Sequence, residues 1–498
     1  MKKIVLVLAV LLVSVSACKN PFLKKMLIEE EKGESSAVPK HTVTFSVEGG
    51  HGTLKATVDS KEINSGDSVE QGKSVVFTAE PAEGYVLEQW TNAGTAITEA
   101  GTDKTYTHTV TANADIKVKF DAPFIEGGAS LILSPNKLTI KVKAVTSDGS
   151  AVAVEGCTET SLASGMYTVL HAKGTVVILK GKITELSCGY YNQLTALNVQ
   201  GCTALQELYC NDNQLTELNV QGLTALKSLE CYGNQLTALN VQGLTALQTL
   251  LCWYNQLTAL NVQGLTALQW LNCGGNQLTE LKVQGLTALR SLECGGNQLT
   301  ALDVQGLTTL YRLECFNNQL TALNVQGLTA LQELWCYYNQ LTELNAQGCT
   351  ALKELWCGSN QLTELKVQGC TALQTLACYD NQLTELNMQG LTALQKLGCS
   401  DNQLTALNVQ GLTALQGLAC YSNQLNADAF KKLFDDLPQW ADSDDAKCCL
   451  YTEETGVSEG NHTDFTAPPD LAAAFNNAKN NKKWKMYKWN ISGPWVEI

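Results

Sequence analysis

Residues 226–246 read LKSLECYGNQLTALNVQGLTA, and this repeated unit decides the fold. Its asparagine recurs with a constant period of 21 from Asn192 to Asn423, and its cysteine occurs eleven times at the same period. Leu229 and Cys231 are two positions apart, so both side chains of a short strand point inward. Self-similarity at one fixed period predicts a solenoid in which each unit stacks on its neighbours.

The unit matches the pattern L-x-x-L-x-L-x-x-N-x-L, with cysteine in the third leucine position. It therefore resembles the leucine-rich repeats of bacterial surface proteins, including internalin-like proteins, over residues 183–425. The resemblance implies a β-rich fold, a leucine-rich-repeat solenoid that forms an arc with a parallel sheet on its concave face. About twelve coils at about 4.8 Å each would span on the order of 55 Å.

The spacing within a coil predicts how the chain turns. The buried amide of Asn234 is expected to bond to backbone groups of its own coil and of the next one. Because each coil is so short, the return segment 236–241 is expected to be extended or 3₁₀ rather than α-helical. Gly243 then allows the chain to turn back toward the next strand.

The repeated cysteines are expected to be reduced thiols in the core. Stacked Cα atoms about 4.8 Å apart lie within disulfide range, but their Cβ vectors run parallel into the core. Cysteine also packs well as a small buried hydrophobe. Disulfides or a metal are the alternative, although the chain has no Cys-x-x-Cys and residues 183–425 contain no histidine.

The N-terminus has the pattern of an export signal. Lys2 and Lys3 precede an apolar run of about ten residues, which is too short to span a bilayer. The following Val15-Ser16-Ala17-Cys18 resembles the lipobox of bacterial lipoproteins. Residues 1–17 are therefore expected to be a signal peptide, with Cys18 lipidated and residues 18–40 forming a flexible tether. An ordinary secretory signal with a chance cysteine is the alternative.

Three further segments flank the array. Residues 41–121 alternate apolar and polar side chains, and Gly84-Tyr85-x₄-Trp90 resembles the all-β repeat modules of bacterial surface proteins. We expect Tyr85 and Trp90 to be core residues rather than ligand contacts. The β-like residues 122–182 are expected to form the N-terminal cap of the array. Residues 426–498, with apolar side chains at helical spacing, are expected to form a C-terminal α/β cap.

Within the C-terminal cap, the conspicuous side chains favour structural roles. Trp484 and Trp489 are expected to pack as core. The adjacent Cys448 and Cys449 are interpreted as structural rather than as a redox pair. The acidic stretch 442–445 lacks the loop glycine of a calcium site, so no metal site is predicted there.

Differences among the copies concentrate at outward-facing strand positions. The return segment barely changes, whereas every aromatic residue between residues 192 and 420 lies in the strand half, beside several glutamates. Random divergence would explain the variation but not the aromatic bias, and exposed Trp and Tyr are typical of interaction surfaces. The predicted ligand-binding residues of the concave face are Tyr209, Tyr232, Trp253, Tyr254, Trp270, Phe316, Trp335, Tyr337, Tyr338, Trp356 and Tyr379.

Charge and motifs restrict the function. The chain of 498 residues has a net charge of −14 and so lacks the electrostatic character of nucleic-acid-binding proteins. No nucleophile–base set, phosphate loop or metal motif is visible, so neither an enzymatic activity nor a cofactor is predicted.

The resemblance to internalin-like proteins implies an adhesin at the outer membrane or cell surface, held to the membrane through its lipid anchor alone. Its expected partner is a surface protein of a host or of another bacterium. A glycan ligand is one alternative. A structural role in the envelope without a defined ligand is the other.

Overall fold

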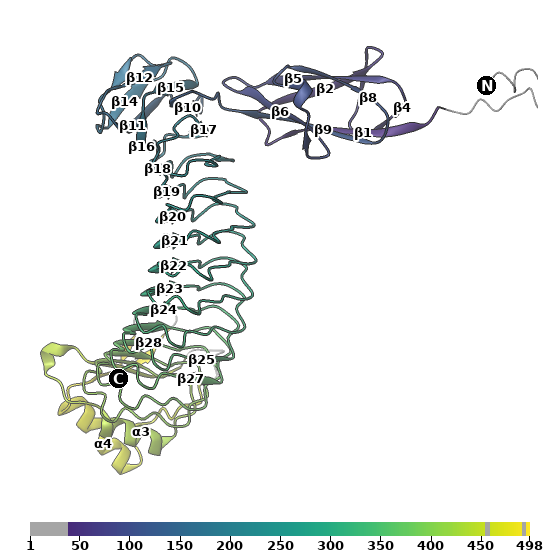
Figure 1. Ribbon diagram of the computed structural model, residues 1–498. Helices are drawn as coiled ribbons and strands as arrows, with labels where there is room; N and C mark the ends of the chain where they lie inside the picture. Colours follow the sequence, from purple (N-terminus) through teal and green to yellow (C-terminus); the bar gives the residue numbers. More distant parts are fainter. Residues whose placement is uncertain (1–37, 454–458, 491–494) are drawn as a thin grey trace, which may run out of the picture. The chain divides into compact units, whose positions relative to one another are not determined.

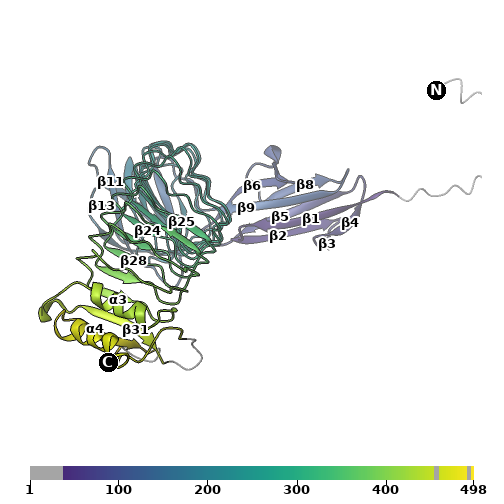
Figure 2. The same cartoon turned by 90° about the horizontal axis from the view of Figure 1, so that it is seen from below.

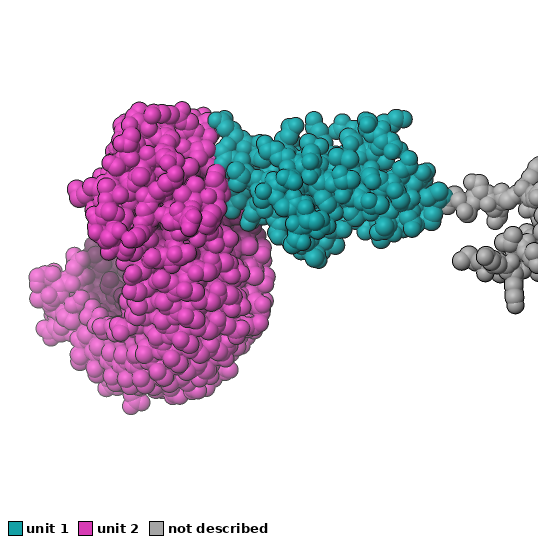
Figure 3. Space-filling view, turned by 45° about the horizontal axis from the view of Figure 1, so that its top comes forward, with its two compact units in different colours: residues 1–121 teal, residues 122–498 magenta. Residues whose placement is uncertain are grey.

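The computed structural model describes residues 38–453, 459–490 and 495–498. The predicted signal peptide, the lipidation site Cys18 and nearly all of the predicted tether lie outside the described residues. The chain separates into two compact units that divide after Asp121, shown in different colours in Figure 3. No helix in the described ranges is long and apolar enough to cross a membrane.

The first unit consists of two small sheets around one apolar core. Their strand orders are β4-β1-β9-β6-β7 and β3-β2-β5-β8. Phe77 and Trp90 are fully buried, and the Trp90 indole donates a hydrogen bond to the Asp103 carbonyl at 2.9 Å. The prediction that Trp90 is a core residue is therefore confirmed, whereas Tyr85 is half-buried and stacks on His51. The strands are β1 Lys40–Glu48, β2 Gly52–Val58, β3 Lys61–Ile63, β4 Asp67–Glu70, β5 Ser74–Pro81, β6 Val86–Asn92, β7 Thr95–Ala96, β8 Thr105–Thr109 and β9 Ala114–Asp121.

The second unit starts with an N-terminal cap that continues into the array without a break. β10 pairs with β15 on one side and with β17 on the other, and β17 already belongs to the first coil. β11 pairs with β14 and with β16, and β16 begins the parallel sheet of the array. The Asn192 amide exchanges hydrogen bonds with the backbone of Lys141 in β11, at 2.9 and 3.0 Å. The strands are β10 Gly128–Leu133, β11 Thr139–Thr146, β12 Val152–Glu155, β13 Ser161–Leu162, β14 Thr168–His171, β15 Val176–Lys180, β16 Ile183–Ser187 and β17 Leu194–Asn198.

The array is a leucine-rich-repeat solenoid of eleven regular coils, each adding one short strand to a parallel sheet. The pairing is in register at an offset of one repeat, with Leu208 beside Leu229, so identical positions stack along the arc. About twelve coils were expected; the first is irregular because Cys188 is one residue out of phase and β17 pairs with the cap. The strands are β18 Glu207–Tyr209, β19 Ser228–Glu230, β20 Thr249–Leu251, β21 Trp270–Asn272, β22 Ser291–Glu293, β23 Arg312–Glu314, β24 Glu333–Trp335, β26 Glu354–Trp356, β28 Thr375–Ala377, β29 Lys396–Gly398 and β30 Gly417–Ala419.

The return segments run along the other side of the solenoid. Over residues 192–425 they form turns and extended chain without a helix, as the coil length predicts. Two of them pair as short parallel strands, β25 Glu343–Asn345 and β27 Glu364–Lys366. Figure 1 shows these two strands on the side opposite β24 and β28, and Figure 2 shows β25 on that same side, so the main sheet lines the inner, concave side of the arc.

The repeated asparagines bind each coil to its neighbour. The Asn318 side-chain nitrogen donates to the carbonyls of Cys315 and Cys294, both at 3.1 Å, and its oxygen accepts from the Leu299 amide at 2.9 Å. The predicted bond to the next coil is therefore wrong in direction: the partners lie in the same coil and in the preceding one. The direction differs because the asparagine lies at the turn of its own coil and its side chain points toward the preceding coil.

The eleven cysteines that recur with the repeat, from Cys210 to Cys420, are called the ladder cysteines and form a column beside the inward-pointing leucines. All eighteen cysteines in the described residues are free thiols with buried side chains, which agrees with the prediction of core thiols. Burial raises the pKa of Cys273, Cys336 and Cys378 to about 12 and that of seven other ladder thiols well above the usual range. The pKa of Cys420 is raised by a hydrogen bond with Cys448 and by burial. These thiols are thus held in the neutral form at any physiological pH.

The C-terminal cap extends the parallel sheet and covers the last coil with two helices. Asn461 takes the ladder role after Asn423, because its oxygen accepts from the Leu425 amide and its nitrogen donates to the Cys420 carbonyl, both at 2.9 Å. The Trp484 indole is buried and donates to a cap carbonyl, as expected for core. The elements are α3 Ala427–Asp436, β31 Lys447–Thr452, α4 Pro469–Asn480, β32 Lys485–Trp489 and β33 Val496–Glu497.

Candidate functional site: the concave face

Each coil presents three outward side chains on the concave face. They are the first and third residues of the strand and the residue after the ladder cysteine, because every second side chain of extended backbone points the same way. Between β18 and β30 these positions carry six glutamates but only two cations, Arg312 and Lys396. The concave face is therefore acidic, as the sequence predicts, and most of its aromatic side chains lie in two groups.

The N-terminal aromatic cluster comprises Tyr232, Trp253 and Tyr254. The Tyr232 and Trp253 rings stack at 4.3 Å between centroids and 10° between planes, because they occupy the same position in consecutive coils. Tyr254 meets Trp253 edge to face at 4.9 Å. Burial, with help from the charge of Asp212, raises the pKa of Tyr232 to about 12, so its hydroxyl remains a hydrogen-bond donor at neutral pH.

The C-terminal aromatic cluster joins residues of four coils: Phe316, Trp335, Tyr337, Tyr338, Trp356 and Tyr379. Phe316 and Tyr337 stack at 4.8 Å and 3°, while Trp335 and Trp356 lie 6.4 Å apart. Tyr379 leans back over Gly358, where a Cβ atom would come within 2.6 Å of its ring. Trp335, Tyr337, Trp356 and Tyr379 together line a hollow of about 300 Å³.

The remaining predicted residues lie apart from the clusters. Tyr209 donates its hydroxyl to Glu207 at 2.6 Å in the first regular coil, and Trp270 begins β21 with 37% of its surface exposed. Tyr254 and Tyr338 are not on strands: both sit in the following turn with positive φ, at the edge of the concave face. The structure therefore brings nine of the eleven predicted residues into clusters and leaves Tyr209 and Trp270 separate.

Arg312 contacts three carboxylates and one aromatic ring of the concave face. Its guanidinium hydrogen-bonds to Glu314, lies 3.2 Å from Glu333 and 3.7 Å from Glu293, and sits over the Trp335 ring at 5.2 Å. One cation thus faces three carboxylates. Burial raises the pKa of Glu314, an effect that Arg312 opposes and Glu293 reinforces.

A depression separates the two aromatic clusters and is called the glycine slot below. Two consecutive coils carry Gly-Gly after the ladder cysteine, and these four glycines form its floor. Trp253 and Tyr254 stand at one end and Phe316 at the other, and the enclosed volume is about 470 Å³. The polar groups on its lining belong to the side chains of Asn272, Glu293, Glu314 and Asn317, together with the Tyr254 hydroxyl and the Trp253 indole nitrogen.

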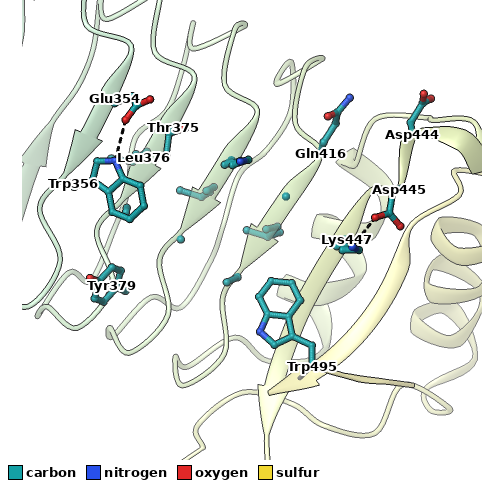
Figure 4. Close-up of a pocket in the computed structure, with 17 residues that line it drawn as sticks. Glu354, Trp356, Thr375, Leu376, Tyr379, Gln416, Asp444, Asp445, Lys447 and Trp495 are labelled. Carbon is teal, nitrogen blue, oxygen red and sulfur yellow. Dashed lines mark hydrogen bonds and ion pairs between the residues drawn. The ribbon is translucent and has the colours of Figure 1, made fainter. Parts of the chain in front are cut away.

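A second depression, the terminal hollow, lies between the last coils and the C-terminal cap (Figure 4). Its floor is made of small residues at strand positions, among them Ala377, Gly398 and Gly417, so the large side chains at its two ends stand above it. Trp356 rises on the array side and Trp495 on the cap side, as Figure 4 shows, and the enclosed volume is about 630 Å³.

Sequence reasoning missed the residues that shape these depressions. Trp495 and Lys447 reach the terminal hollow because β31 continues the parallel sheet, with Lys447 beside Gly417, although residues 447–452 do not follow the period of the repeat. The glycine floor is visible in the aligned copies as two consecutive Cys-Gly-Gly-Asn segments. Tyr421 was also missed; it stands after the last ladder cysteine and stacks on Trp489 at 5.0 Å.

The face offers flat aromatic surfaces, carboxylates and apolar hollows. Within the described residues, no three His, Cys, Asp or Glu side chains are placed to hold a metal ion. The arrangement is suited to binding, because aromatic side chains held by stacking lose little conformational freedom when a partner covers them.

Comparison with known proteins finds one family match, in the first unit. A family described as the divergent InlB B-repeat domain matches residues 41–123, which confirms the expected all-β repeat module of bacterial surface proteins. No curated protein matches the chain.

Solved structures of similar fold include two proteins from Listeria monocytogenes and one from Yersinia enterocolitica. The functional domain of InlJ from Listeria monocytogenes, which includes a cysteine ladder, is 28% identical, with a TM-score of 0.48 over 60% of this chain and 74% of that one. InlF from Listeria monocytogenes is 23% identical, with a TM-score of 0.42 over 50% and 84%. YopM from Yersinia enterocolitica is 24% identical, with a TM-score of 0.39 over 49% and 58%.

Proposed function

We propose that this protein is a lipid-anchored bacterial surface protein that binds a partner protein through its concave face. The observation that carries the proposal is the distribution of aromatic side chains. Between residues 192 and 420 all of them lie in the strand half or its turn, and none lies on the equally accessible return half. Trp and Tyr dominate the energetics of protein interfaces, and patches of them on a monomer mark binding surfaces.

The rigidity of the array supports the same function. Every coil is joined to the next by the sheet and by the asparagine ladder, and the aromatic rings are stacked in pairs before any partner arrives. A surface that is ordered in advance loses little entropy on binding. The terminal hollow and the glycine slot are concave, so each accepts a protruding side chain of the partner.

The location at the cell surface rests on the sequence. The Val15–Cys18 lipobox pattern supports lipidation of Cys18, and the match of residues 41–123 to a B-repeat domain is consistent with a spacer that carries the array away from the membrane. Adhesion to a host cell or to another bacterium follows as the proposed role of the interaction.

Binding of the purified 41–498 fragment to extracellular matrix proteins, intact cells and a glycan array tests the proposal. The decisive variant is the double change Trp335→Ala, Trp356→Ala in the C-terminal aromatic cluster. Loss of interface anchors of this kind weakens binding by about 2 kcal/mol or more, a factor of about 30. The matched control is Tyr190→Ala, Tyr191→Ala, which removes two aromatic side chains that are 63% and 72% exposed at the other end of the array.

The expected result is saturable binding to a protein that the tryptophan variant loses and the tyrosine control keeps, with the circular dichroism spectrum unchanged in both. Binding to polysaccharides with the same dependence would replace the protein partner with a glycan. Binding that survives the tryptophan change would move the site to another surface. An absence of binding throughout would favour a structural role in the envelope.

A further inference from the structure

The glycine slot is the part of the concave face whose chemistry is most specific. Its floor exists because two neighbouring coils lack side chains there. A Cβ atom on Gly275 would come within 2.4 Å of the Tyr254 ring, and one on Gly295 within 2.7 Å of the Phe316 ring. Both rings therefore lean over glycine from opposite ends and leave an open space between two aromatic walls.

The charged groups that line the slot, the carboxylates of Glu293 and Glu314, are acceptors. Two of the four floor amides donate within the sheet, Gly275 to Gly295 and Gly296 to Phe316, both at 2.9 Å. The Asn272 amide donates to Glu293 at 2.6 Å, while its oxygen accepts from the Gly274 amide. Apart from Asn317, the Tyr254 hydroxyl and the Trp253 indole nitrogen, the lining offers carboxylate oxygens and aromatic rings to an occupant.

The charge around the slot is unbalanced. Glu293 and Glu314 stand side by side in β22 and β23, and Arg312 is the cation that both of them share with Glu333. Glu293 lies 3.7 Å from that guanidinium, farther than Glu314, which is 2.9 Å from its Nε atom, and Glu333 at 3.2 Å, and 28% of the Glu293 side chain is exposed. The buried position of Glu314 and its raised pKa are consistent with a site where a second cation would be stabilised.

We infer that the glycine slot binds the guanidinium group of an arginine side chain of the partner protein, between the Trp253 and Phe316 walls and against Glu293. This inference rests on the proposed function and names the chemistry that the partner presents. Guanidinium fits because it is planar, has five N–H donors and no acceptor, and stacks on aromatic rings. A sugar ring also stacks on tryptophan, but it is neutral, so it would not gain the charge interaction that a guanidinium gains with Glu293 and Glu314.

The test uses the full chain labelled with 5-fluorotryptophan, in which the Trp253 signal is assigned with Trp253→Phe. The probes are a capped pentapeptide with a central arginine and the same peptide with citrulline, which has almost the same shape but no charge. We expect the arginine peptide to shift the Trp253 signal saturably at concentrations up to about 20 mM, and added salt to weaken the effect.

Two variants and one control locate the site. Glu293→Gln should weaken the response at least several-fold. Gly274→Tyr should abolish it by filling the slot, and it should fold because tyrosine stands at this position in other coils, as Tyr232 does. Glu230→Gln changes the same strand position three coils away and should leave the response intact.

An equal response to the citrulline peptide, or no response to the arginine peptide at these concentrations, would overturn the inference. So would a response that Glu293→Gln leaves unchanged. Because the probes are peptides, failure here leaves the partner-binding experiment with the Trp335 and Trp356 variant unaffected, so the two proposals fail separately.

Discussion

Raising the pH should unfold the array because of its buried thiols. The structure holds Cys273, Cys336 and Cys378 at a pKa of about 12, whereas a thiol in an unfolded chain ionises near pH 8.5. Below about pH 7.5 both states keep nearly all of these protons, and the thiols change the stability by less than about 1 kcal/mol. Between about pH 8.5 and 12 the unfolded chain loses protons that the folded chain retains, so stability falls as the pH rises.

The magnitude follows from the number of thiols. At pH 9.5, one unit above the unfolded pKa, each thiol favours unfolding by about 1.4 kcal/mol. The eleven ladder cysteines together contribute about 15 kcal/mol, which matches the whole stability of a typical domain. At pH 8.0 the same eleven thiols contribute only about 2 kcal/mol. The loss should therefore be confined to a narrow range of pH.

Urea unfolding followed by circular dichroism, with a phosphine reductant present from pH 7.5 to 9.5, measures this effect. Cys315→Ala should cost about 1 kcal/mol at pH 7.5 through lost packing, and should reduce the average pH slope between about pH 7.5 and 9.5 by about 0.7 kcal/mol per unit. The first unit, residues 38–121, contains no cysteine and should show no such loss. An unfolding free energy of the array that stays constant within about 1 kcal/mol over this range would refute the reasoning.

Two other changes have outcomes set by the contacts of single residues. Asn318→Ala leaves the Leu299 amide and the carbonyls of Cys294 and Cys315 buried without their partner. The free energy of unfolding measured in urea should therefore fall by about 3–6 kcal/mol. A fall of less than about 1 kcal/mol would mean that the asparagine ladder is not a main source of stability. Arg312→Gln leaves three clustered carboxylates without their cation, so the unfolding free energy should fall by about 2–4 kcal/mol at pH 7 and recover toward pH 4 as the carboxyls protonate. An equal loss at both pH values would contradict that electrostatic explanation.

The solenoid could be predicted because a single 21-residue period runs through about half of the chain. Two-residue spacing places Leu229 and Cys231 inside, and the shortness of the coil excludes a helix in the return segment. The Arg312 group could also have been found by aligning the copies, because β23 pairs Arg312 with Glu333 in the next coil and Glu314 with Glu293 in the preceding one.

The depressions could not be predicted in the same way. Their form depends on how side chains lean, as Tyr254 does over Gly275, and a repeat pattern gives position but not rotamer. The role of Asn461 could not be predicted because a helix and a strand of the cap separate it from Asn423. The 21-residue period is therefore lost there, although Asn461 makes the same hydrogen bonds as the repeated asparagines. Trp495 reaches the concave side through the same irregular cap.

Site-specific photocrosslinking on the cell surface tests the central claim most directly. A benzoylphenylalanine in place of Trp356, on the concave face, is compared with one in place of Ala322, on the exposed return half. If the concave face binds the partner, a covalent adduct with a protein forms from the Trp356 position and none forms from the Ala322 position. An adduct from Ala322 alone, or equal capture from both positions, would contradict the proposal that the concave face is the binding surface.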